Sequence, residues 1–331
     1  MRGSFKHRPH PEGPDVWRIV VPTPWPVGPV NVYVLDDEPL TLVDTGPATP
    51  EAMAAIEAGL AAHGRRVEDL GRLVISHQHT DHWGMAAELV ARSDAEVCAL
   101  RGLDDYMSAY PASLFAEDAF ADDLLTRHGA SVAASGAAVY RGDLHYAASV
   151  GTDRVLADGD VLGFAGGDLR VLHRPGHSPT DTVLWDEARG LLLGADHVMA
   201  KRSVAVMAPP GADEPPRPRA LARYRASLDA TRALGAAVVL PGHGEPVTDP
   251  DAVIARRLRG FDRMTARVGE AVGDRPRTAM EIALGLRGGD VPDHAAFFVL
   301  CDVLGHLDEL IDAGAVVEVE TDGRAGFAVA A

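Results

Sequence analysis

The sequence predicts an α/β protein in which a mixed sheet, or two sheets, are covered by helices. Short apolar runs with strand character follow one another directly, and helical stretches are interspersed among them without strict alternation. The length of 331 residues suits one large domain or two unequal ones. A doubly wound fold, in which strands and helices alternate strictly, is therefore disfavoured.

The first half of the chain opens on a Pro-rich segment, for which we expect irregular structure. Strands are predicted at 30–35 and 40–43, and the acidic turn between them makes a hairpin. Apolar side chains at helical spacing then predict a helix that ends at His63 and Gly64. The elements expected next are a strand at 73–76, a helix at 85–91, a strand at 97–100 and an inserted helical pair at about 104–138.

The second half begins with strands and ends with a separate small module. Strands are predicted at 168–173, 182–185, 191–194 and 236–240, with a Pro-rich surface loop and then a helix near 218–234. A change of composition after Arg263 predicts two domains, 1–262 and 263–331. In the second we expect a short helix, a longer helix with an apolar stripe and a hairpin at 316–329, which is a winged-helix-like α+β arrangement.

Charge and composition exclude several classes of protein. The net charge of −17 disfavours a protein that depends on non-specific binding to nucleic acid. No apolar run approaches the roughly 18 to 20 residues that cross a bilayer, and the charged start has no signal-peptide core. Cys98 and Cys301 lie too far apart for a thiolate metal motif and form no disulfide framework, so we expect a soluble, cytoplasmic protein.

Three His and one Asp gather in the loop His77-x-His79-x-Asp81-His82, directly after an apolar strand. Side chains two apart leaving a strand point the same way, so His77 and His79 can share one metal ion. Asp81 and His82 lie beyond the bend and can face a second ion. Imidazole and carboxylate ligands suit Zn²⁺ or another borderline first-row ion. A merely polar surface loop is the alternative interpretation.

His177, Asp196 and His243 stand in the same setting, each directly after another apolar strand. Ligands at the same end of several strands converge on one edge of a sheet. Taken singly, each of the three has an ordinary structural interpretation. Taken with the first loop, they complete two metal sites.

These motifs together resemble the metallo-β-lactamase-fold hydrolases over about residues 16–262. The resemblance implies an αββα sandwich with a dinuclear site on its edge. It further implies that His77, His79 and His177 hold the first metal ion, that Asp81, His82 and His243 hold the second, and that Asp196 bridges them. The matching segments are the first loop, Pro175-Gly176-His177-Ser178, Gly194-Ala195-Asp196-His197, Pro241-Gly242-His243-Gly244 and Leu42-Val43-Asp44-Thr45-Gly46.

The C-terminal module makes the chain similar to the β-lactamase-like-2 branch, which sits near the hydroxyacylglutathione hydrolases (glyoxalase II) and includes an animal mitochondrial endoribonuclease. Two departures from that branch stand out. Thr180 and Asp181 occupy positions where the branch more often has Gly and His, and Ala195 replaces a common Gly. Neither departure touches an implied ligand, so both bear on the substrate.

The first hypothesis is a dinuclear metal-dependent hydrolase that uses a metal-bridging hydroxide on a small ester or thioester, such as an acyl-CoA or acyl-glutathione-like conjugate. Two divalent ions, Zn²⁺ or alternatively Mn²⁺ or Fe²⁺, lower the pKa of a shared water and polarise the substrate. Asp81 is the candidate catalytic residue, which orients the hydroxide and holds its proton. The ions leave a local positive charge, so we expect an anionic small-molecule substrate.

Three further residues are candidates for supporting roles. Asp44 either hydrogen-bonds a metal-bearing loop or serves as a turn residue before Gly46. His197 is expected to support the site or the core rather than to bind metal. Lys201 is a candidate contact for an anionic substrate group, with a solvated surface charge as the alternative.

Two other functions remain open on the same metal ligands. A phosphodiesterase or endoribonuclease is the second hypothesis, but residues 274–331 hold 4 Arg, no Lys and 11 acidic residues, a net charge of −7 that repels phosphates. An iron dioxygenase is the third, and the complete second ligand set argues against it. Exposed acids and an apolar stripe on the helix at 295–313 favour a homodimer or a pocket-closing role for the C-terminal module.

Overall fold

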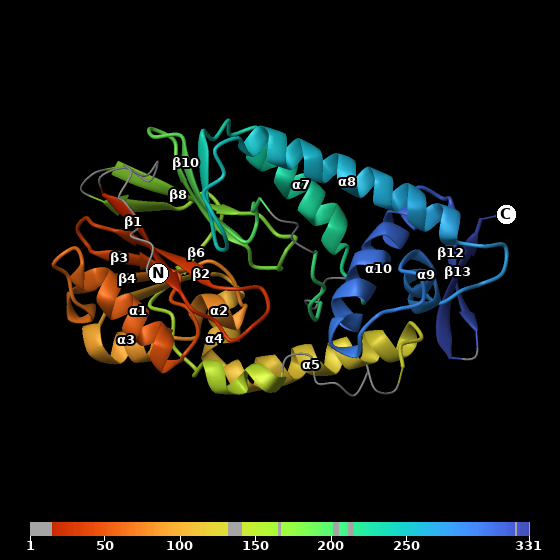
Figure 1. Cartoon of the computed structure of the whole chain (residues 1–331), viewed down its shortest axis with the longest axis horizontal. Helices are drawn as coiled ribbons and strands as arrows, with labels where there is room; N and C mark the ends of the chain where they lie inside the picture. The colour runs from red at the N-terminus through yellow and green to blue at the C-terminus, as the bar shows by residue number, and fades with distance from the viewer. Residues whose placement is uncertain are drawn as a thin grey trace, which may run out of the picture.

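Two β-sheets pack face to face, and helices cover the outer face of each sheet (Figure 1). The computed structural model describes residues 15–131, 141–164, 167–200, 205–210, 215–321 and 323–330. This arrangement confirms the predicted αββα sandwich. Within the described residues, no helix is long and apolar enough to span a membrane.

The first sheet has six strands in the order β1-β2-β3-β4-β5-β6. β1 to β3 pair antiparallel, whereas β3 to β6 pair parallel, so the carboxyl ends of the last four strands lie at one edge. All six residues of β2 are buried, which fits the place of this strand inside the sheet. The strands are β1 (Val16–Val21), β2 (Val30–Leu35), β3 (Thr41–Val43), β4 (Arg72–Ile75), β5 (Glu96–Leu100) and β6 (Arg154–Leu156).

The second sheet has five strands in the order β11-β10-β9-β8-β7. β7 to β10 pair antiparallel, and β10 and β11 pair parallel, so β8, β10 and β11 run in one direction. Their carboxyl ends therefore share one edge, as the ligand positions predicted. The strands are β7 (Val161–Phe164), β8 (Gly167–His173), β9 (Thr182–Asp186), β10 (Leu191–Ala195) and β11 (Val238–Pro241).

Three apolar layers hold the sandwich together. Tyr33, Val74 and Val171 belong to the layer between the sheets. A second layer packs the first sheet against its helices, and a third packs the second sheet against α7 and α8. The helices of these two outer layers are α1 (Pro50–Ala61), α2 (Thr80–Trp83), α3 (Ala86–Ser93), α4 (Leu103–Ser108), α5 (Tyr110–Arg127), α7 (Ala220–Arg232) and α8 (Pro250–Ala271).

Most of the predicted elements are confirmed, including the helical pair, which forms α4 and α5; residues 132–138 of that prediction lie outside the described residues. The expectation of irregular structure at the start is wrong for β1, because Val16–Val21 between the flanking prolines is mostly β-branched and apolar and buries four of its six side chains. β6 and β7 were not predicted, since three or four residues carry too little periodicity for a strand to be recognised.

The C-terminal module consists of α9 (Ala279–Leu286), α10 (Ala296–Asp312) and the hairpin of β12 (Val316–Thr321) and β13 (Arg324–Val329). Thr278 and Glu281 form a capping box at the start of α9. The apolar stripe of α10 joins the layer that covers the second sheet. α8 runs through the predicted boundary at residue 262, so the two predicted domains are joined by one continuous helix and one core.

The expectation that the acids of α10 are exposed is wrong for Asp308, of which 2% is exposed. Its carboxylate accepts hydrogen bonds from Arg217 at 2.6 Å and from Arg219 at 2.7 Å. Glu309 pairs with Arg225 of α7. The acids of α10 therefore bind arginines from the segment before and within α7, and they attach the module to the catalytic half.

We expect Asp308→Ala to lower the free energy of unfolding by about 3 kcal/mol, because the change leaves two partly buried arginines without their shared counter-charge. Urea denaturation followed by circular dichroism measures the loss. The matched control is Asp312→Ala, which removes a half-exposed carboxylate paired with Arg219 and should cost less than about 1 kcal/mol. Equal losses in the two variants would contradict a stabilising buried cluster.

Candidate metal centre

The candidate site lies where strand ends of both sheets meet at one edge. Thr182 of β9 donates its backbone N–H to the carbonyl of Ser76 after β4, at 2.9 Å. From the first sheet, the hydroxyl of Tyr33 and the side-chain amide of Asn31 both donate to the carbonyl of Pro241 in β11. These bonds fix the loops after β4 and β11 relative to one another, and the loops carry the predicted ligands.

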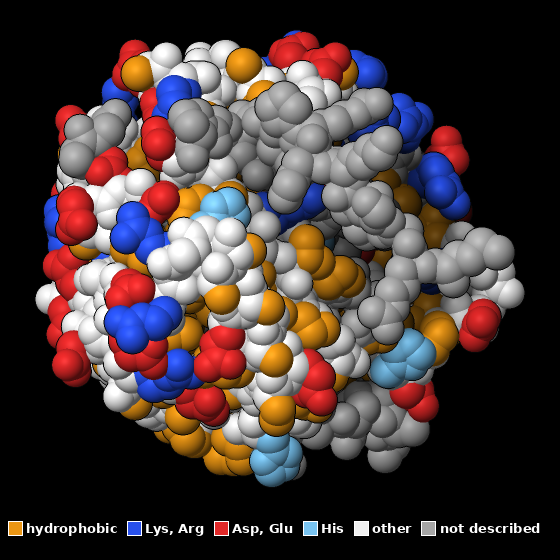
Figure 2. Space-filling view, turned by 60° about the vertical axis from the view of Figure 1, so that its left-hand side comes forward, with side chains coloured by type: hydrophobic (Ala, Val, Ile, Leu, Met, Phe, Trp, Pro, Cys, Tyr) orange, Lys and Arg blue, Asp and Glu red, His pale blue; other side chains and the backbone are white. Residues whose placement is uncertain are grey.

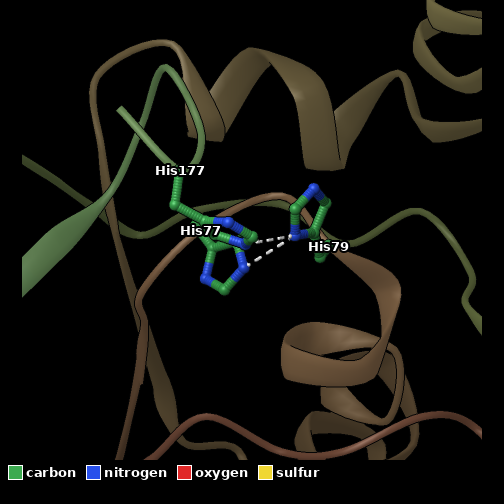
Figure 3. A group of neighbouring side chains, drawn as sticks. All are labelled: His77, His79 and His177. Atoms are coloured by element: carbon green, nitrogen blue, oxygen red, sulfur yellow. Dashed lines mark hydrogen bonds between the residues drawn. The ribbon is translucent and has the colours of Figure 1, made fainter. Parts of the chain in front are cut away.

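His77, His79 and His177 form the first group (Figure 3). Nδ1 of His79 lies 3.0 Å from Nε2 of His77 and 3.0 Å from Nε2 of His177. His79 precedes the short helix α2, and His177 comes from the loop after β8. The structure thus brings His177 to His77 and His79, which lie about a hundred positions earlier, as the strand-end argument predicted.

Asp81, His82 and His243 form a second group directly beside the first. Nε2 of His243 lies 3.2 Å from a carboxylate oxygen of Asp81, and Nε2 of His82 lies 3.9 Å from the same oxygen. Asp81 and His82 are in α2, whereas His243 follows β11. The group contains all the residues that the resemblance implied for a second ion.

Asp196 lies between the two groups. One oxygen is 3.5 Å from Nε2 of His177 and 3.7 Å from Nε2 of His243, and the other is 3.4 Å from Nε2 of His82. A single carboxylate therefore faces ligands of both groups, which is the position that a bridging ligand needs. The exposed fraction of Asp196 is only 5%.

Hydrogen bonds from behind orient the ligands. Asp44 accepts from the backbone N–H and hydroxyl of Ser76 at 2.9 and 2.8 Å, and a carboxylate oxygen lies 2.7 Å from Nδ1 of His82. Nδ1 of His243 lies 2.8 Å from the carbonyl of Pro29. Because these acceptors hold the proton on Nδ1, Nε2 of both imidazoles keeps its lone pair toward the site.

Glycines let the ligand loops approach closely. A Cβ on Gly242 would collide with Asp196 and His82. Gly176 has φ of 155°, and a Cβ there would collide with Tyr224 of α7. The Pro-Gly-His sequence occurs twice because each His must follow a backbone position at which no side chain fits.

The imidazoles of the site differ in the direction of their pKa shifts. Burial lowers the pKa of His77 well below its usual range and lowers that of His79 to about 3, so both are neutral. Burial also acts to lower the pKa of His82, but the nearby carboxylates of Asp81 and Asp196 outweigh it and raise that pKa. The carboxylates beside Nε2 of His82 therefore favour a positive charge at that point, which a bound divalent ion would supply while the imidazole stays neutral.

The residues present fit a pair of divalent ions. Nε2 of His82 and Oδ1 of Asp196 are buried and, within the described part of the chain, lack a hydrogen bond of normal geometry. Buried polar atoms without partners are costly, and a cation between them would satisfy both. Imidazole nitrogens and carboxylate oxygens are also the donors that zinc and similar ions prefer.

The remaining predicted residues lie around this centre. His197 is fully buried, and its Nε2 lies 2.8 Å from the hydroxyl of Thr231, so it supports the packing of α7. Lys201 lies outside the described residues. Asp181 accepts from the backbone N–H and hydroxyl of Ser178, which fixes the turn after His177. Ala195 has φ of 39°, a conformation that favours glycine, the residue that the resemblance implies at this position.

A polar link between the His loop and α5 was not predicted. Gln78 lies between His77 and His79 in the sequence. Its side-chain amide donates to Glu117 at 3.3 Å and accepts from the hydroxyl of Thr180 at 2.8 Å. Glu117 also accepts from the hydroxyl of Tyr106 at 2.8 Å. A buried Glu on a helix of mixed charge has no local pattern, so only the three-dimensional structure shows that it supports the loop.

A family model described as the metallo-beta-lactamase superfamily matches residues 25–243. The chain belongs to this superfamily. A Bacillus subtilis (strain 168) protein named "Probable metallo-hydrolase YqjP" is 31% identical over 300 residues, which cover 89% of this chain and 92% of that protein. An Emericella nidulans protein named "Atrochrysone carboxyl ACP thioesterase" is 24% identical over 230 residues, or 69% of this chain and 55% of that protein.

Two crystal structures match almost the whole length of this superfamily member. The metallo-beta-lactamase family protein TTHA1429 from Thermus thermophilus is 25% identical with a TM-score of 0.78, covering 96% of this chain and 99% of that one. A beta-lactamase domain protein from Burkholderia ambifaria is 25% identical with a TM-score of 0.81, covering 96% and 93%. Because the matches take in nearly all of this chain, the arrangement of sandwich and C-terminal module recurs in both.

We expect Asp44→Asn to weaken metal binding by about 10- to 100-fold, because an amide nitrogen facing Nδ1 of His82 disturbs the orientation of that imidazole. Competition with a chromophoric chelator measures the affinity. Asp186→Asn is the matched control, since Asp186 is a buried carboxylate at the opposite end of β9. Unchanged affinity in the Asp44 variant would show that this carboxylate serves the turn alone.

Burial raises the pKa of Glu117 to about 7, above its ordinary value near 4.5. The folded protein then binds this proton more tightly than the unfolded chain, so the contribution of Glu117 to stability falls as pH rises from about 4.5 to 7. Between pH 5 and 8, the free energy of unfolding of the parent protein should fall by about 2 kcal/mol more than that of Glu117→Gln, because the Gln side chain does not titrate. Urea denaturation at both pH values tests this, and parallel pH profiles would contradict it.

Proposed function

We propose that the protein is a hydrolase that uses two divalent metal ions, Zn²⁺ in the first instance, to cleave a small ester or thioester. The observation that carries this proposal is the meeting of two ligand groups across the shared carboxylate of Asp196. Membership of the metallo-beta-lactamase superfamily supports it, as does the similarity to a protein named as a metallo-hydrolase.

In this proposal, His77, His79 and His177 would hold one ion, Asp81, His82 and His243 would hold the other, and Asp196 would contribute to both sites. Bound ions of this kind polarise the bond to be broken and make a water molecule acidic. The protein supplies fixed hydrogen-bond acceptors behind the imidazoles: Asp44, Ser76 and the carbonyl of Pro29 hold His82, His77 and His243 in one orientation. A site fixed in this way needs little reorganisation during the reaction.

Asp81 is the proposed catalytic residue. Although burial acts to raise its pKa, the adjacent His82 and His243 outweigh that effect and hold the pKa below its usual value. The carboxylate is thus ionised and can accept a proton from a nucleophilic water through its Oδ atoms. The side chain of Asp81 is 14% exposed, so water can reach the carboxylate.

A covalent mechanism through cysteine does not fit the chain. Cys98 and Cys301 are both buried, and burial raises the pKa of each thiol to about 12. Thiolate is the nucleophilic form of cysteine, so neither residue supplies one at neutral pH. We therefore propose direct attack by a water molecule, which a bound metal ion would make acidic.

One comparison and one sequence resemblance support the thioester part of the proposal. One similar protein is named as a thioesterase, although it shares only 24% identity over 230 residues. The order of helix, helix and hairpin at the C-terminus is winged-helix-like, and resembles the branch near glyoxalase II. We assign this module a structural role and propose a small anionic substrate in a cytoplasmic protein, with nucleic acid as the less favoured partner.

Metal-loaded protein should release free thiol from one or more members of a panel of acyl thioesters, including acyl-CoA and acyl-glutathione conjugates. His79→Ala should lower kcat/KM at least about a hundredfold, because loss of a metal ligand removes several kcal/mol of transition-state stabilisation. His294→Ala, which alters an exposed His in the C-terminal module, should leave activity unchanged. Equal turnover in the His79 variant, or none in metal-loaded parent protein, would refute the proposal.

A further inference from the structure

A cavity of about 390 Å³ lies along α8, outside the candidate metal centre. Four arginines contribute to its lining, namely Arg256, Arg257, Arg263 and Arg267. Val253, Phe261 and Met264 supply apolar lining, and Ala200, four positions after Asp196, closes one side. We call this cavity the α8 groove. It combines a basic rim with an apolar floor in a protein whose net charge is −17.

Helical periodicity explains why these residues share one face. Residues 253, 256, 260, 264 and 267 are three or four positions apart, so they form one stripe along α8. Gly260 stands in the middle of the stripe, where the nearest neighbour of an added Cβ would be the guanidinium of Arg263 at 3.9 Å. The absent side chain opens the groove between the arginines.

Three of the arginines have no counter-charge inside the described part of the chain. Arg256, Arg263 and Arg267 are exposed, and no ion pair joins them to a described acidic side chain. By contrast, Arg217, Arg219 and Arg225 are held by acids of α10. An exposed arginine without a counter-charge retains its full capacity to bind an anion.

The fourth arginine connects the groove to the loop that follows Asp196. Arg257 is buried and donates to the carbonyls of His197 and Met199 at 3.2 and 2.7 Å. Arg256 reaches the carbonyl of Ala200 at 3.4 Å. The wall of the α8 groove is thus the continuation of the segment that carries a proposed metal ligand.

The shape and chemistry of the groove favour a small phosphorylated ligand. Its volume lies in the range of small-molecule pockets, roughly 300 to 1,000 Å³. Guanidinium groups bind phosphate oxygens in a bidentate manner, and the apolar floor can receive a base or an alkyl group. The exposed arginines span only about 16 Å of helix, and Asp262 lies among them in sequence, which is unfavourable for an extended nucleic-acid strand.

We propose that the α8 groove binds the phosphate groups of a small phosphorylated molecule. Resting on the proposed hydrolase function, we further assign that molecule as the coenzyme A part of an acyl thioester, held by its phosphates while the acyl end reaches the metal centre. This assigns a substrate class to the site and a specificity role to Arg256, Arg263 and Arg267.

Isothermal titration calorimetry with coenzyme A tests the groove without requiring turnover. Metal-loaded protein should bind coenzyme A, adenosine 3′,5′-bisphosphate should compete, and pantetheine should not. The triple variant R256Q/R263Q/R267Q should weaken binding at least about tenfold. Arg259→Gln is the matched control, because Arg259 is an exposed arginine of α8 outside the groove lining, and it should change binding less than twofold.

Thermal unfolding checks that the triple variant is folded, and hydrolysis of a glutathione thioester checks that its metal centre is intact. If the proposed hydrolase function fails but coenzyme A binds through the arginines, the phosphate site stands and only its link to catalysis is lost. Absence of coenzyme A binding, or equal binding in the triple variant, overturns the site. Loss of single-stranded RNA binding in the triple variant, with coenzyme A binding unaffected, overturns the small-molecule assignment.

Discussion

The buried carboxylate of Asp44 is the interaction on which the metal centre depends. Asp44 directly follows β3, accepts two hydrogen bonds from Ser76 after β4, and faces Nδ1 of His82 in α2. One side chain thereby joins two parallel strands to the helix that carries two proposed ligands. Its φ of 61° places the backbone in a left-handed turn as well. The two roles considered for Asp44 from the sequence, turn residue and support for the metal loop, are both visible in its geometry.

The residues of the metal centre could be predicted from the sequence because they lie in short local motifs. His77, His79 and His177 each stand beside an apolar strand, and parallel strands bring such positions to one edge. The supporting residue Glu117 had no such signal, since its partner Gln78 lies far away in sequence and the helix around it has no motif. The exposure of Asp308 was mispredicted for a similar reason, because its burial depends on arginines about ninety positions earlier.

Charged side chains are distributed unevenly over the protein, and so are their ion pairs. On the face shown in Figure 2, acidic and basic side chains are interspersed around the rim, and hydrophobic side chains gather toward the middle. On α10, the carboxylates of Asp308 and Glu309 form ion pairs with arginines of the catalytic half. Part of the negative charge of the C-terminal module therefore attaches the module to the rest of the protein. Along α8 the balance reverses, and exposed arginines remain available. The net charge of the chain therefore describes neither α10 nor α8. Which charged side chains can bind a partner depends on which of them already form ion pairs within the protein.

The metal centre must also be costly to the fold when no cation is bound. His82, Asp196 and His77 are almost completely buried, and burial disfavours the charged forms that carboxylates and imidazoles adopt in water. Gly176 and Gly242 are tied to close approaches that no other residue fits, and Ala195 adopts a conformation usually reserved for glycine. This arrangement persists because the packing of the two sheets and their helices fixes the position of each strand end without the ligands. Since only the folded state brings the ligands of the first loop together with His177, Asp196 and His243, a cation binds it more tightly than the unfolded chain, and metal affinity becomes part of the stability of the sandwich.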